Sequence, residues 1–133
     1  MVWALRKVAI KHCSARPLPG VFKGMIGIAV DFRAGIACPA INRPAAGKEI
    51  VFFSVERLLA RMNPQEFEAM ARRRRQAPRE LLHSVLKTAA ASAQRVLDQE
   101  GSSEEARGKV LRLLCQGEVL PGRNGELVFE VLV

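Results

Sequence analysis

The chain has 133 residues, of which 49% are hydrophobic and 26% are charged, a composition that excludes an intrinsically disordered protein. Its length is typical of one domain, so we expect a single basic domain over residues 1–133. The 21 Lys and Arg residues outnumber 13 Asp and Glu, and the net charge of +8 favours an acidic partner.

The sequence carries no pattern typical of secretion or of a membrane protein. Arg6 and Lys7 lie within the first ten residues, and no long apolar segment typical of a signal peptide follows them. No apolar run approaches the roughly 20 residues that span a bilayer. The three cysteines are odd in number and lie far apart, unlike those of a disulfide framework. We therefore expect a cytoplasmic protein of bacterial type, with reduced thiols and no membrane partner.

The first half of the chain predicts β-structure. In Met25–Phe32 large apolar residues alternate with small or polar ones, which is typical of a half-buried strand. Arg33–Gly35 is a predicted turn, after which Ile36–Cys38 returns beside the first strand. Glu49–Phe53 is rich in β-branched and aromatic residues and predicts a buried strand. Lys7–His12 gives a weaker strand signal.

The middle of the chain predicts helices with recognisable ends. Ser54 and Asn63 are expected N-caps of the first two helices, and Ser102 with Glu105 forms an expected capping box for the fourth. Gly101 ends the third. The predicted helices span Val55–Met62, Pro64 to the Arg72–Arg75 run, Pro78–Glu100 and Ser103–Cys115.

The tail predicts a β-hairpin. Glu118–Leu120 and Leu127–Val133 flank a turn that contains Asn124-Gly125, a strong hairpin signal. Strands, then about four helices, then a hairpin predict an α+β fold, with a small antiparallel sheet from the N-terminal half and helices packed on it. The hairpin either extends that sheet or forms a separate flap.

No residue pattern predicts catalysis or metal binding. Asn42–Glu49 lacks the leading Gly and the final Ser or Thr of a phosphate-binding loop. His12 and Cys13 are adjacent on a predicted strand and would point to opposite faces. We expect His83 on the polar side of its helix, and no cysteines or histidines have metal-ligand spacing. We therefore expect no enzymatic activity, catalytic residue, cofactor or metal.

The most distinctive feature is a run of four arginines, Arg72–Arg75, extended by Arg79. Four consecutive residues sweep around a helix end, so at least two must be exposed. Cations at a helix C-terminus are favourable, which explains one or two of them, whereas arginine also binds phosphate bidentately and stacks on bases. The predicted nucleic-acid-binding residues are Arg72, Arg73, Arg74, Arg75, Arg79, Lys7, Lys11, Lys23 and Arg123.

These residues favour a non-enzymatic nucleic-acid-binding protein or a nucleoprotein accessory subunit, with DNA and RNA both open. The alternative is a protein-interaction or oligomerising subunit that docks an acidic partner or pairs with itself through a sheet edge, because Leu127–Val133 is mostly apolar. A helix pair followed by a hairpin is also the element order of a winged helix. Glu104 and Glu105, however, stand where its base-reading residues would lie.

Overall fold

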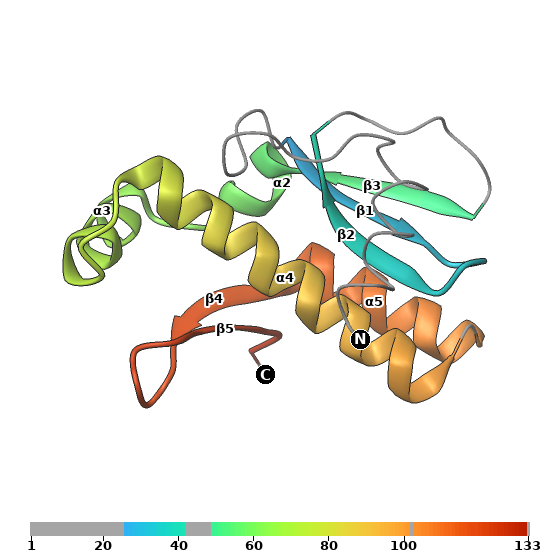
Figure 1. Ribbon diagram of the computed structural model, residues 1–133. Helices are drawn as coiled ribbons and strands as arrows, with labels where there is room; N and C mark the ends of the chain where they lie inside the picture. The colour runs from blue at the N-terminus through green and yellow to red at the C-terminus, as the bar shows by residue number, and fades with distance from the viewer. Residues whose placement is uncertain (1–25, 42–48, 102, 133) are drawn as a thin grey trace.

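The computed structural model describes residues 26–41, 49–101 and 103–132 (Figure 1). The predicted strand Lys7–His12 lies outside these ranges. A three-stranded antiparallel sheet, four helices and a two-stranded C-terminal hairpin within them confirm the α+β prediction. The elements are β1 (Gly27–Asp31), β2 (Ile36–Ala40), β3 (Ile50–Ser54), α2 (Val55–Leu59), α3 (Pro64–Arg73), α4 (Pro78–Glu100), α5 (Glu104–Gln116), β4 (Glu118–Pro121) and β5 (Leu127–Glu130).

Strand β1 is the centre of the three-stranded sheet, whose order is β2-β1-β3. Ile28 and Val30 join the main core, while Ala29 packs against Cys38 and Ala40 on the opposite face. Both faces of β1 are therefore buried, and the expectation of a half-buried strand is wrong. The residues that alternate with the large ones are small enough to be covered on the second face.

The predicted turn between β1 and β2 is confirmed. The buried carboxylate of Asp31 accepts hydrogen bonds from the backbone N–H groups of Arg33 and Ala34, each at 3.0 Å, as Asp does in tight turns. Gly35 has a φ of 69°, a left-handed conformation that glycine adopts at little steric cost. The hydrogen bonds of Asp31 and the conformation of Gly35 thus form the turn that places β2 antiparallel to β1.

The helix ends largely follow the predicted caps. The side chains of Ser54 and Asn63 accept hydrogen bonds from backbone N–H groups in the first turns of α2 and α3. At α5, however, the cap is Ser103, whose hydroxyl accepts from the N–H of Ala106 at 3.1 Å, so the expected Ser102 cap is wrong by one residue. Serine is a favourable N-cap residue at either position, but the capping-box spacing to Glu105, which favoured Ser102, is not the one that the helix uses.

Helix α4 is the central element of the fold, because it packs against β2 and β1, α5 and the hairpin (Figure 1). His83 lies three and seven residues before Leu86 and Ala90 and thus on the same buried stripe. Its side chain is only 6% exposed, so the expectation of a solvated residue is wrong. Burial first, and then the charges of Arg79 and Lys87, lower the pKa of His83.

The hairpin β4–β5 forms a sheet of its own and does not extend the three-stranded one. Val119 and Phe129 are buried in the main core, where β5 packs against α4. The hairpin therefore completes the core on the side of α4 away from the first sheet (Figure 1).

Candidate nucleic-acid interface

The arginine run lies where α3 ends and the chain turns into α4. The N–H of Gln76 donates to the carbonyl of Ala71 at 2.9 Å, and the N–H of Arg75 donates to that of Arg72 at 3.1 Å. These two bonds form the closing motif that usually has glycine at its left-handed position. Here that position is Arg75, with a φ of 54°.

Local electrostatics explain some of these arginines and not others. Arg72 and Arg73 are exposed in the last turn of α3, where the helix dipole favours cations. Arg79 is exposed in the first turn of α4, where the dipole disfavours them. Arg75 is also exposed, on a backbone conformation that disfavours any side chain. Helix stability therefore accounts for neither Arg75 nor Arg79.

Arg74 connects this turn to the hairpin. Its Nε donates to Oε1 of Gln76 at 3.0 Å, and its Nη1 donates to the backbone carbonyl of Gly125. Arg123 is exposed in the same hairpin loop, which bends between β4 and β5 with the N–H of Gly122 bonded to the carbonyl of Glu126 at 2.6 Å. The half-buried Arg74 thus holds the loop of Arg123 against the end of α3.

We name the five exposed residues Arg72, Arg73, Arg75, Arg79 and Arg123 the arginine corner. Four of them lie where α3 ends and α4 begins, at the end of α4 remote from α5 (Figure 1), and Arg123 lies in the hairpin loop. Beside it a cavity of about 380 Å³ separates α3 from the hairpin. Its lining residues are Met70, Arg73, Arg74, Pro121, Gly125 and Leu127.

The guanidinium groups of the arginine corner are not neutralised by carboxylates of the described residues. The ion pairs within the described residues lie outside the corner and join Arg107 to Glu49 at 2.7 Å and Lys109 to Glu100 at 2.8 Å. Arg107 also lies over the ring of Phe32, 4.6 Å from its centroid, and so fastens α5 to the first sheet. Arg107 and Lys109 are thus held in ion pairs, whereas no ion pair within the described residues involves an arginine of the corner.

The fold thus brings some, but not all, of the predicted nucleic-acid-binding residues together. Arg72, Arg73, Arg75 and Arg79 share one corner and Arg123 joins them through the hairpin loop, while Arg74 is engaged in bonds within the fold. The predicted contacts Lys7, Lys11 and Lys23 lie outside the described residues. The left-handed conformation of Arg75 was not foreseen, because no glycine or asparagine follows α3 to signal it.

Other kinds of site find no support in the described ranges. They contain no group of three or more His, Cys, Asp or Glu residues arranged to hold a metal ion, and Cys38 and Cys115 are free thiols. None of the described helices has the length and apolar character to cross a membrane. Comparisons with known protein families, curated proteins and solved structures find no match to this chain.

Proposed function

We propose that the protein binds nucleic acid through the arginine corner. The observation that carries this proposal is Arg75, an exposed arginine at a position where helix geometry favours glycine. Residues held in unfavourable backbone conformations cluster at functional sites. Arg79 supports the same proposal, because the dipole of α4 disfavours its charge and it forms no ion pair within the described residues.

The corner is suited to phosphate rather than to bases. A guanidinium group offers a planar set of N–H donors that matches a phosphate in bidentate geometry. Stacking on bases usually needs exposed aromatic side chains, and each phenylalanine that the structure describes is buried or half-buried. We therefore infer that binding is largely independent of sequence, since phosphate contacts supply affinity and register but little base discrimination.

Arg74 is a positioning residue in this proposal. Its bond to the carbonyl of Gly125 sets the hairpin loop, and hence Arg123, against the rest of the corner. Helix α5 takes no part as a recognition helix, because Glu104 and Glu105 are exposed in its first turn and would repel phosphate. The protein is thus an accessory binder with a phosphate-contacting corner, not a winged-helix reader of bases.

Charge reversal in the corner tests the proposal. We expect the double variant Arg73→Glu/Arg75→Glu to weaken binding to labelled duplex DNA, single-stranded DNA and RNA by roughly tenfold or more, because it replaces two phosphate contacts with repulsion. Fluorescence anisotropy measures the affinity, and circular dichroism checks the fold.

The matched control is Arg57→Glu/Arg112→Glu, which makes the same change in net charge at exposed positions on α2 and α5. We expect this control to retain most of the affinity. Equal losses in the two variants would show that net charge, and not the corner, determines binding. Absence of binding at low salt would remove the proposal and leave an acidic protein as the partner to search for.

A further inference from the structure

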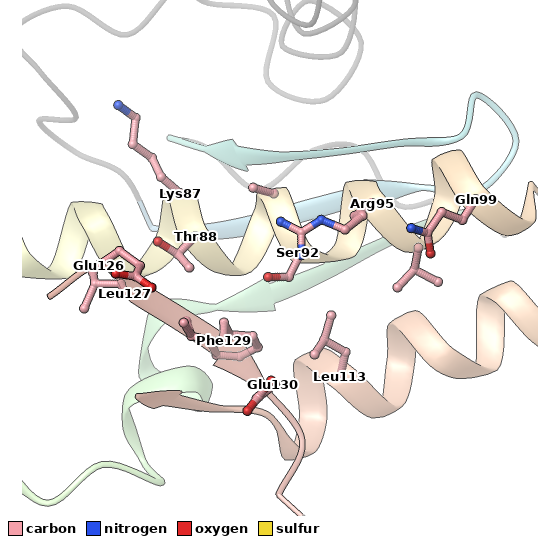
Figure 2. A pocket seen from close by; sticks show the side chains of 13 residues that line it. Lys87, Thr88, Ser92, Arg95, Gln99, Leu113, Glu126, Leu127, Phe129 and Glu130 are labelled. Carbon is pink, nitrogen blue, oxygen red and sulfur yellow. The ribbon is translucent and has the colours of Figure 1, made fainter. Parts of the chain in front are cut away.

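A groove of about 690 Å³ runs between α4 and β5 (Figure 2), and none of its lining residues belongs to the arginine corner. Helix α4 contributes one face, with the small side chains of Thr88, Ala91 and Ser92 in its middle. The hairpin contributes five consecutive residues, Glu126–Glu130. Neighbouring residues of a strand point to opposite faces, so a groove that touches all five runs along the edge of the strand.

The backbone of β5 has unpaired hydrogen-bonding groups on this edge. The N–H of Gly122 donates to the carbonyl of Glu126, and Leu120 lies opposite Val128. In an antiparallel pair the inward-facing positions alternate, so Val128 and Glu130 face β4. The backbone groups of Leu127, Phe129 and Val131 therefore face away from it, and no described strand pairs with them.

The two edges of the hairpin differ in how they are protected. Pro121 ends β4 opposite Leu127, so its nitrogen, which has no N–H, lies on the outer edge of β4. A proline at such a position blocks the addition of another strand. The segment Leu127–Leu132 contains neither proline nor lysine, so the edge of β5 remains suited to pairing.

The charges and the apolar residues of this region fit a second copy of the chain. Arg95 on the α4 side and Glu130 on the β5 side are both exposed, and neither forms an ion pair with a described residue. A two-fold arrangement brings the same surface of both copies together and offers each of these charges a partner of opposite sign. Leu132, 52% exposed just after β5, would be covered by the same contact.

We propose that two copies of the chain associate through their β5 edges, antiparallel, to form a continuous sheet β4-β5-β5-β4. Main-chain hydrogen bonds of Leu127, Phe129 and Val131 join the copies, as in other strand additions. This proposal is independent of the nucleic-acid proposal, because the groove contains no residue of the arginine corner.

Sedimentation equilibrium of the full chain tests the association. The protein is freed of nucleic acid by nuclease and high-salt washing, so that bridging by a bound strand cannot imitate a dimer. We expect a reversible species of twice the 14.6 kDa chain mass in the micromolar range. A monomer at every concentration would overturn the proposal and leave the groove to an extended segment from elsewhere.

Two variants locate the contact. Val131→Pro removes an outward-facing N–H, and Arg95→Glu places a like charge opposite Glu130, so each should raise the dimer dissociation constant roughly tenfold. The control Arg112→Glu makes the same charge change on α5, outside the groove, and should leave the dimer intact. If Val131→Pro does not fold, Arg95→Glu decides alone. A dimer that withstands the charge reversal would overturn the assignment to β5.

Discussion

Arg75 has the left-handed backbone (φ 54°) at which α3 ends, and its side chain faces solvent. For residues with a Cβ atom this conformation costs about 1–2 kcal/mol relative to a right-handed one. The hydrogen bonds that Gln76 and Arg75 donate back into α3 maintain it. A glycine would make the same bonds without that cost, and this is why we propose a binding role for the guanidinium group of Arg75.

We predict that Arg75→Gly separates stability from binding. The free energy of unfolding should rise by about 1 kcal/mol, because glycine relieves the left-handed strain, while affinity for nucleic acid should fall. Urea denaturation and fluorescence anisotropy measure the two effects on the same protein.

The matched variant is Arg112→Gly, which makes the same replacement inside helix α5. It should lower the free energy of unfolding by about 1 kcal/mol, the cost of glycine in a helix interior, and leave the affinity unchanged. If Arg75→Gly bound nucleic acid as the wild type does, Arg75 would have no part in the site.

Among the elements, α4 organises the fold through contacts that are distant in the sequence. Gln94 accepts a hydrogen bond from the N–H of Ala37 at 2.8 Å and donates to the carbonyl of Gly35 at 3.0 Å. Strand β2 is an edge of the first sheet. The side chain of Gln94 therefore supplies hydrogen-bond partners to backbone groups of Ala37 and Gly35 that no neighbouring strand bonds. One amide thereby fixes α4 against the β1–β2 turn.

We predict that Gln94→Met lowers the free energy of unfolding by about 1–3 kcal/mol, since it keeps the length of the side chain but leaves the backbone groups of Ala37 and Gly35 without their partner. Thermal or urea unfolding checks the value. Gln99→Met, at an exposed position of the same helix, is the control and should change stability little. Equal effects of both variants would mean that the loss arises from the helix and not from its bonds to β2.

Elements that depend on interactions between residues close in the sequence were predicted well, and contacts between distant residues were not. Caps such as Ser54 and Asn63, and the turn at Asp31, are set by residues within three positions, and these elements were predicted closely. Ser103 was missed because the capping-box spacing to Glu105 favoured its neighbour Ser102, while α5 begins one residue later. Gln94 bonds a residue 57 positions away, and no local pattern reveals such a contact.

The candidate site was likewise predicted only in part from the sequence. The arginine run is visible in the sequence, but its junction with Arg123 depends on the bond from Arg74 to Gly125, 51 residues apart. The distinction between Arg74, engaged in the fold, and its exposed neighbours likewise needed the structure. His83 was wrongly expected on the polar side of α4, although its helical spacing from the buried Leu86 and Ala90 is that of a buried position.

In the whole molecule, the two proposed surfaces lie on different parts of the framework built around α4. The arginine corner lies at the α3–α4 junction and the hairpin loop, which Arg74 joins through its bond to Gly125. The groove with its strand edge follows α4 and β5 (Figure 2). The net charge of +8 would attract nucleic acid to the protein in general. We propose that the arginine corner, rather than the overall charge, makes the contacts with phosphate.

The salt dependence of binding tests this claim most directly. Fluorescence anisotropy on labelled duplex DNA over a series of salt concentrations gives the slope of log affinity against log salt. Neutralised phosphates each contribute about −0.9, so five corner arginines predict a slope of about −4 to −5, and Arg73→Glu/Arg75→Glu should make it less steep by about 2. A slope that the double variant leaves unchanged, or no binding at low salt, would contradict the account.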